Sequence, residues 1–272
     1  MFYVSNHDSH MTQRIALGIE YDGSRFNGWQ MQAHGTRTVQ AVVQQALSIV
    51  ADHDVQLTCA GRTDTGVHAT GQVVHFDCAS TRQLKAWVMG ANAHLPDDVC
   101  VHWAREVDDE FSARFSAVMR AYRYIILNRR ARSALQHGRV SWIYDTLDVN
   151  AMQTAAQALL GDQDFSSFRS AACQATHARR YMESIELTHD ADYILVDIRA
   201  NAFLHHMVRN IVGSLLVIGR GEQPESWLGE LLELKDRTRA GPTAPPDGLY
   251  LVSVDYPQHY QLPLSGVLPR FA

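Results

Sequence analysis

The stretch Cys59-Ala60-Gly61-Arg62-Thr63-Asp64-Thr65-Gly66-Val67-His68-Ala69-Thr70-Gly71-Gln72 lies between two apolar runs, residues 55–59 and 73–76. An apolar run, a glycine-rich turn and a second apolar run are typical of a loop carried on two strands. Glycines let the backbone adopt positive φ and bring a substrate close, and loops held by strands commonly carry chemistry. Asp64 is the only acid between Asp54 and Asp77. If the loop is a site, the Asp64 carboxylate is its reactive group. The alternative is an exposed turn in which Asp and Thr cap the local backbone.

Length and composition describe an ordinary globular protein. The chain has 272 residues, of which 46% are hydrophobic and 19% charged, enough for one large domain or two small ones. Its four cysteines have neither CxxC spacing nor the density of a disulfide scaffold, which predicts free thiols in a reducing compartment. Residues 1–13 lack the pattern of a secretory signal, and Met11 is a possible natural start. The longest apolar run, 203–218, is shorter than the ~20 residues that span a bilayer. We therefore expect a cytoplasmic protein without a membrane segment.

The charge distribution is uneven. The net charge is −5, yet residues 111–144 contain no Asp or Glu and carry a local charge of +7 from seven arginines. Nucleic-acid binding depends on such local patches more than on the total charge. Arginine also binds phosphate in a bidentate manner and stacks on bases. The segment therefore indicates a polyanionic partner. Its arginines are Arg114, Arg120, Arg123, Arg129, Arg130, Arg132 and Arg139.

Strands and helices alternate along the chain. The clearest helix begins at Thr38, because apolar residues recur at i, i+3, i+4, i+7, i+8 and i+11 from Val39 to Val50. Residues 120–127 alternate as a strand, with Tyr122 on one face and Arg123 on the other. We expect an α+β fold of two similar halves, residues 12–108 and 109–272, each an antiparallel sheet with helices on one face. The other expected strands are 14–21, 55–59, 73–76, 99–103, 181–187, 193–199 and 249–256, and the other helices are 82–92, 149–160, 205–218 and 225–233, with 106–110 as an acidic connector.

The expected helix at 205–218 contains a charge in an apolar setting. Arg209 shares a face with His206, Asn210 and Gly213, beside a stripe of large apolar residues. An arginine buried there needs a partner, because an unpaired buried charge costs several kcal/mol. The alternative is an arginine that extends along the helix surface to reach water.

Five sequence blocks, in this order, resemble the bacterial tRNA pseudouridine synthase A (TruA) family. They extend from Tyr21 to Leu251 and so involve nearly the whole chain. The blocks are Tyr21-Asp22-Gly23-Ser24 with Phe26 and Gly28-Trp29-Gln30; Gly61-Arg62-Thr63-Asp64 with Gly66-Val67-His68 and Gly71-Gln72; Tyr122-Arg123-Tyr124; Asn201-Ala202-Phe203-Leu204-His205-His206-Met207-Val208-Arg209; and Gly248-Leu249-Tyr250-Leu251.

The resemblance implies isomerisation of uridine to pseudouridine at positions 38, 39 and 40 in the anticodon stem-loop of tRNA, without a cofactor or a metal. It implies a homodimer in which two similar halves meet at a continuous sheet around a central basic cleft. The family's catalytic aspartate matches Asp64, its active-site tyrosine Tyr122, its aspartate-pairing arginine Arg209 and its base-contacting leucine Leu249. The family most often has alanine after the aspartate. This chain has Thr65, whose hydroxyl could alter hydrogen bonding around the carboxylate.

The chemistry implied by the resemblance fits these residue types. The C1′–N1 bond must break, the base must rotate and C1′ must join C5, which requires a nucleophile that can attack and then leave. A carboxylate does this without a cofactor, by attack either on C1′ or on C6 of the base. We assign Arg209 the orientation of Asp64. Tyr122 would stack on the flipped base, and its hydroxyl could help to remove the C5 proton; Leu249 would form the other wall of the pocket. The expected RNA contacts are Arg62, Arg114, Arg120, Tyr122, Arg123 and Arg129.

Two other functions compete with this interpretation. A non-catalytic RNA-binding protein could use the same cleft, but it would not need an Asp–Arg pair. A metal-dependent hydrolase is suggested by 14 histidines, among them His68, His75, His205 and His206. Adjacent histidines on a helix point to different sides, and no HxxxH or HxH motif aligns them with a carboxylate. The pattern therefore argues against a metal and favours a role in helix packing for His205 and His206.

Overall fold

The computed structural model describes residues 12–32, 35–263, 266–269 and 271, so the possible starts at Met1 and Met11 lie outside the described residues. Ten strands of the described part form one sheet in the order β4-β1-β3-β10-β5-β9-β8-β7, with β2 paired to β3 and β6 to β5. The strands are β1 (Gln13–Tyr21), β2 (Thr58–Cys59), β3 (His68–Cys78), β4 (Val99–Val107), β5 (Met119–Asn128), β6 (Ser141–Ile143), β7 (Gly161–Asp164), β8 (Arg179–Asp190), β9 (Tyr193–Ala200) and β10 (Leu249–Asp255).

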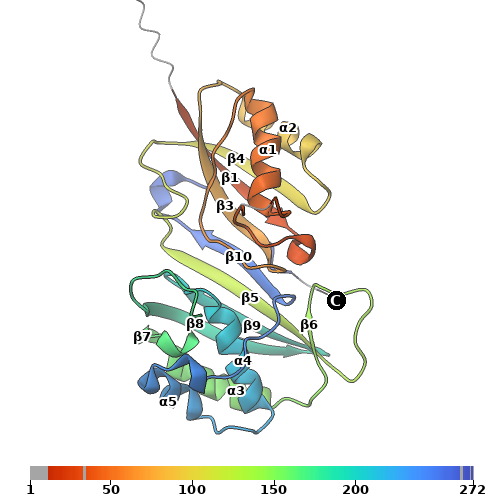
Figure 1. Cartoon of the computed structure of the whole chain (residues 1–272), viewed down its shortest axis with the longest axis vertical. Coiled ribbons are helices and arrows are strands. Elements are labelled where there is room, and N and C mark those ends of the chain that lie inside the picture. Colours follow the sequence, from red (N-terminus) through yellow and green to blue (C-terminus); the bar gives the residue numbers. More distant parts are fainter. Residues whose placement is uncertain (1–11, 33–34, 264–265, 270, 272) are drawn as a thin grey trace, which may run out of the picture.

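The helices form two groups along this sheet. Figure 1 shows α1 and α2 beside the first strands of the chain, and α3, α4 and α5 beside β7, β8 and β9. The α+β class predicted from the sequence is confirmed. The helices are α1 (Val39–Ala51), α2 (Leu84–His94), α3 (Val149–Ala156), α4 (Met207–Gly219) and α5 (Trp227–Leu234). No helix among the described residues is both long and apolar enough to cross a membrane.

The two groups share one continuous mixed sheet. The sequence pattern suggested an antiparallel sheet in each half, and the family resemblance implied that the halves meet in a continuous sheet. Most neighbouring strands are antiparallel, but β10 runs parallel to β3, and β6 runs parallel to β5. β10 comes late in the chain and lies between the groups, with Leu251 opposite Ala69 of β3 and opposite Tyr122 of β5. The strands on one side of this junction come from residues 13–107 and those on the other from residues 119–200. We propose the domain boundary between them.

Side chains of β5 alternate between two hydrophobic clusters, one on each face of the sheet. Tyr122, Tyr124 and Ile126 pack into the main core with the helices. Ile125 and Leu127 belong to a second, smaller cluster with Val140, Tyr250 and Val252. Both faces of β5 are therefore buried, because side chains alternate between the faces of a strand.

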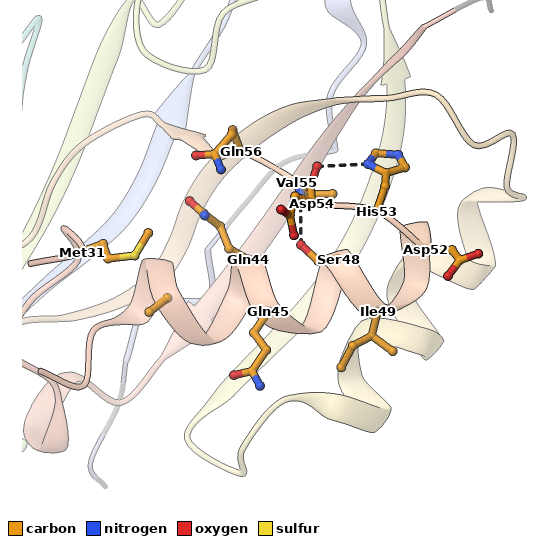
Figure 2. Close-up of a pocket in the computed structure, with 11 residues that line it drawn as sticks. Met31, Gln44, Gln45, Ser48, Ile49, Asp52, His53, Asp54, Val55 and Gln56 are labelled. Carbon is orange, nitrogen blue, oxygen red and sulfur yellow. Dashed lines mark hydrogen bonds between the residues drawn. The ribbon is translucent and has the colours of Figure 1, made fainter. Parts of the chain in front are cut away.

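Helix α1 fixes the segment that leads into the loop of Asp64. Its apolar stripe is buried against the sheet, and it ends where Asp52 adopts a left-handed conformation, φ 61°. Figure 2 shows this end of the helix. Ser48 Oγ accepts a hydrogen bond from the Val55 amide at 3.0 Å, and His53 Nδ1 lies 3.0 Å from the Asp54 carbonyl oxygen. These contacts turn the chain back into β2, which pairs with β3.

Several element boundaries differ from the predicted ones. β4 continues to Val107, because it stays paired with β1 as far as Arg14, so the acidic run begins inside a strand. Of the apolar run 55–59, only Thr58 and Cys59 pair with β3. The helix expected at 205–218 begins at Met207, because His206 has a left-handed backbone, φ 63°. That difference changes the environment of Asp64.

Candidate active site

A cleft of about 1270 Å³ lies between α1 and the start of α4. Its lining includes residues from both groups of elements, among them Asp64, Tyr122, Arg209 and Leu249. Among the described residues that line it, Asp64 is the only acid, whereas five are arginines. A concave surface with one acid among several fixed positive charges suits an anionic ligand. The five arginines are Arg62, Arg114, Arg120, Arg180 and Arg209.

The loop before β3 is held from three directions. The Gln72 side chain donates to the Gly61 carbonyl oxygen at 2.6 Å and accepts from the Gly61 amide at 3.4 Å. Thr63 hydrogen-bonds to the Tyr21 hydroxyl at 2.7 Å and receives the Trp29 amide on its carbonyl oxygen. Gly66 has φ +80°, where a side chain would also meet Pro246. Glycine is therefore required there, and the loop presents Asp64 from a fixed backbone.

Arg209 lies beside Asp64, although the two are 145 positions apart in the sequence. Its Nη1 donates to Asp64 Oδ2 at 3.1 Å, and its Nε donates to the Ala244 carbonyl oxygen at 2.8 Å. The side chains are 14% exposed for Arg209 and 21% for Asp64. A guanidinium bound at two edges has a fixed direction, so it also fixes the direction of the carboxylate.

His205 and His206 both face Asp64, which the sequence interpretation missed. His205 Nε2 lies 3.3 Å from Oδ1 of the carboxylate, and His206 Nε2 lies 3.3 Å from Oδ2. The expectation that they point to different sides of a helix was wrong, because both precede α4 and their rings lie 4.0 Å apart. Burial lowers the pKa of His206, although the Asp64 charge opposes this effect. The apolar residues at 204, 207 and 208 continue the helical pattern on both sides of His206, so the sequence contained no indication that the helix begins only at Met207.

The same three residues are the one group of described residues that could hold a metal ion. Asp64, His205 and His206 each offer a donor atom, and these atoms lie within 4.8 Å of one another. Zinc accepts imidazole and carboxylate ligands. However, the Arg209 guanidinium donates to Oδ2 at 3.1 Å and places a permanent positive charge beside the carboxylate. That charge opposes the binding of a cation there.

Tyr122 and Leu249 provide apolar surface near the carboxylate. The Tyr122 ring is 9% exposed and packs edge-on against Phe203, with ring centroids 4.9 Å apart. A Cβ built on Gly61 would lie 3.7 Å from the Tyr122 hydroxyl, which places that hydroxyl at the Asp64 loop. Burial, assisted by the Asp64 charge, raises the pKa of Tyr122. The phenol is therefore protonated at neutral pH, so it carries a proton that a bound substrate can accept in a hydrogen bond.

Thr65 is exposed at the cleft, and its hydroxyl makes no hydrogen bond to Asp64 or to any other described residue. The geometry around the Asp64 carboxylate is therefore set by Arg209 and the two histidines.

Of the arginines expected to contact RNA, Arg62, Arg114 and Arg120 line the cleft, whereas Arg123 and Arg129 do not. Arg123 is only 7% exposed and forms two 2.7 Å hydrogen bonds to Asp197 on β9. Arg129 is exposed at the end of β5, where it pairs with Asp192. The structure thus corrects the expectation for Arg123, because its side chain points away from the face that carries Tyr122.

We expect Arg123→Ala to lower the free energy of unfolding by about 2 kcal/mol, because it removes two charged hydrogen bonds from a buried side chain. Affinity for tRNA should not change. Arg129→Ala is the matched control, since an exposed ion pair contributes little. Urea denaturation and fluorescence anisotropy measure the two properties. Weaker tRNA binding by Arg123→Ala at unchanged stability would contradict the structural role.

Comparisons with known proteins agree with these residues. A family model described as tRNA pseudouridine synthase matches residues 18–116 and 155–257. The tRNA pseudouridine synthase A of Shewanella loihica (strain ATCC BAA-1088 / PV-4) is 55% identical over 258 residues, covering 95% of this chain and 98% of that protein. The tRNA pseudouridine synthase A of Shewanella sp. (strain MR-4) is 56% identical with the same coverage.

Among solved structures, the crystal structure of a Cbf5-Nop10-Gar1 complex contains a chain with 9% identity and a TM-score of 0.33. The overlap covers 87% of this chain and 57% of that one, and a likeness so distant does not establish a shared fold. The family model and the two relatives lead to a firm assignment. The chain belongs to the tRNA pseudouridine synthase family.

Proposed function

We propose that this tRNA pseudouridine synthase isomerises uridine at positions 38, 39 and 40 in the anticodon stem-loop, with Asp64 as the nucleophile. The observation that carries the proposal is that the described residues of the cleft include a single acid, held by Arg209 at 3.1 Å among four further arginines. Polyanionic RNA needs the arginines, and the isomerisation needs one carboxylate. Family membership supports the reaction class, and the resemblance of the five sequence blocks supports the stem-loop positions.

The reaction needs no net exchange of atoms with a co-substrate. The carboxylate attacks the nucleoside, the C1′–N1 bond breaks, and the base rotates before C1′ joins C5. If the attack falls on C1′, the carboxylate leaves C1′ as C5 joins it; if it falls on C6, the carboxylate leaves C6 after the C1′–C5 bond has formed. In both cases the proton on C5 leaves and N1 gains one. Arg209 holds Oδ2 throughout, while Oδ1 has only His205 beside it. Oδ1 is therefore the oxygen better placed to attack, since it does not have to break a bond to the guanidinium.

The uridine must leave its stack to reach Asp64. Unstacking costs a few kcal/mol unless a protein surface replaces the lost contacts. Tyr122, Phe203 and Leu249 line the cleft and offer such a surface. Arg62 and Arg114 line the same cleft as Asp64, and Arg62 lies two positions before Asp64 in the loop. Their charges therefore stand near the Asp64 loop, where the phosphates beside a flipped nucleotide would pass.

The deciding experiment is mass-spectrometric mapping of pseudouridine in tRNA incubated with the purified protein. We expect product at positions 38, 39 and 40 when uridine is present there. A tRNA with cytidine at all three positions is the control, and it should remain unmodified. Product elsewhere in the tRNA would contradict the assignment of positions but not of the reaction class.

We also propose a cytoplasmic homodimer, as the resemblance implies. Light scattering coupled to size-exclusion chromatography tests whether the protein is a dimer.

Chelation tests the metal alternative that the histidines raise. We expect EDTA at millimolar concentration to leave the rate of pseudouridine formation unchanged, because the Arg209 charge supplies what a cation would supply to Asp64. The assay should use protein dialysed against EDTA, with a mock-dialysed sample as the control. Inhibition that an added metal reverses would show that Asp64, His205 and His206 bind a catalytic ion.

A further inference from the structure

Among the described residues of the cleft lining, Phe115 is the one aromatic side chain that is left largely in water. Its exposed fraction is 79%, compared with 1% for Trp29 and 9% for Tyr122. Water around a phenyl ring is unfavourable, and the folded chain gains little from a ring so placed. Scattered exposed apolar residues need no explanation, but Phe115 lies at a cleft with five arginines. That position suggests a ligand for the ring.

The backbone around Phe115 is fixed. The Ser116 amide donates to the Ser112 carbonyl oxygen at 2.9 Å, and Ser116 Oγ accepts from the Ser112 amide at 2.9 Å. The Ala113 amide donates to His75 Nδ1 at 3.0 Å, and the Ala113 carbonyl oxygen accepts from the Tyr256 hydroxyl at 2.6 Å. An exposed aromatic ring on such a backbone is presented in advance, with less ordering entropy to lose on binding.

Two arginines contribute to the position of the Phe115 loop and ring. Arg120 donates to the carbonyl oxygens of Arg114 at 2.8 Å, Ala117 at 3.0 Å and Asn201 at 2.8 Å, so it ties the loop to the segment before α4. The Arg114 guanidinium carbon lies 5.0 Å from the centre of the Phe115 ring. One face of the ring is thus associated with a cation, as in a cation–π pair.

We propose that Phe115 is a stacking platform for an unpaired base of the RNA substrate, next to the flipped uridine, with Arg114 neutralising the adjoining phosphate. An aromatic ring stacks on any base, and a neighbouring arginine contributes both cation–π and phosphate contacts. The platform differs from the Tyr122 surface, which is buried beside Asp64. Phe115 acts at the entrance of the cleft and supports binding, not the chemical step. This inference rests on RNA being the substrate, as proposed above.

Phe115→Ala should raise KM for tRNA by about five- to 150-fold, the range that alanine substitution of base-stacking aromatics gives. The value of kcat should stay within about twofold, because the ring does not touch the reacting atoms. Phe115→Tyr should behave as the wild type, since the ring is kept. Phe115→Leu should resemble Phe115→Ala, because an apolar side chain without a π-face does not stack. Met89→Ala on α2 is the control, since Met89 is also a large exposed apolar residue but does not line the cleft.

Unfolding temperatures should be equal for all these variants, because the ring makes few contacts in the free protein. If Phe115→Ala has the KM of the wild type, the proposal is overturned. If Phe115→Leu has the KM of the wild type, base stacking is not the reason why Phe115 supports binding. A direct binding assay separates this inference from the proposed function. If the wild-type protein forms no pseudouridine, the proposed function fails, but anisotropy with a labelled anticodon stem-loop RNA still tests the platform. Equal affinity of the wild type and Phe115→Ala for that RNA would then overturn it.

Discussion

Asp64→Asn is expected to abolish pseudouridine formation while tRNA binding persists. The amide is close to the carboxylate in size, so the loop held by Gln72 and Thr63 keeps its shape. An amide is a poor nucleophile, and removal of a catalytic nucleophile in other enzymes lowers turnover by roughly 10⁶-fold. Binding should be equal or slightly stronger, because the only carboxylate among the described residues of the cleft is lost, while five arginines remain. Mass spectrometry of the tRNA measures product, and anisotropy measures binding.

The preparation must be free of wild-type enzyme. When the variant is expected to be so much slower, even a trace of wild-type enzyme would form more pseudouridine than the variant does. Co-expression in a strain without its own enzyme of this type, followed by intact-mass analysis, provides that control. Product from a clean Asp64→Asn sample would refute the nucleophile assignment. Loss of both product and binding in a protein with normal unfolding temperature would instead make Asp64 a substrate contact.

Arg209→Lys is expected to lower kcat by about 100-fold, a typical consequence of a misplaced reacting group, with a much smaller change in tRNA affinity. The positive charge is kept, so the electrostatic attraction of the cleft for RNA is nearly the same. However, lysine has one nitrogen and cannot bond both the Ala244 carbonyl oxygen and Asp64 Oδ2 with fixed geometry. The carboxylate would then lose its fixed direction. Single-turnover rates and anisotropy separate the two effects.

Thr65→Ala is the matched control for Arg209→Lys. It also changes a neighbour of Asp64, but the Thr65 hydroxyl makes no hydrogen bond to a described residue, so its activity should stay within about twofold of wild type. Equal losses in rate and affinity for Arg209→Lys would identify Arg209 as an RNA contact. A comparable loss for Thr65→Ala would show that Thr65 acts directly on the substrate.

Local patterns in the sequence predicted those parts of the fold that local patterns determine. The apolar stripe after Thr38 indicated α1, and the alternation along 120–127 indicated β5. The single mixed sheet could not be predicted in this way. It depends on two residue pairs between β10 and β3, Tyr250 with His68 and Leu251 with Ala69, which are more than a hundred positions apart. The short strands β6 and β7 were also missed, because three or four residues are too few to show a period.

The sequence pattern showed only that an arginine buried in the apolar setting of 205–218 would need a partner. The family resemblance identified that partner as Asp64, and the structure places the two side chains in contact. The sequence also contained the signal that Arg123 lies away from the cleft, because alternation along β5 places it on the other face of the strand from Tyr122. The positive charge of residues 111–144 nevertheless favoured the prediction of an RNA contact. The approach of His205 and His206 to Asp64 could not be foreseen, because it depends on the left-handed backbone of one residue with no glycine to indicate it.

The position of β10 at the centre of the sheet also determines when the enzyme can become active during its synthesis. Until β10 has emerged from the ribosome, the start of β3 has no partner on that side, and Leu249 is absent from the cleft. The growing chain therefore carries Asp64 long before it can complete the site around it. We therefore expect a chain that terminates before β10 to be inactive on tRNA, even though it contains Asp64.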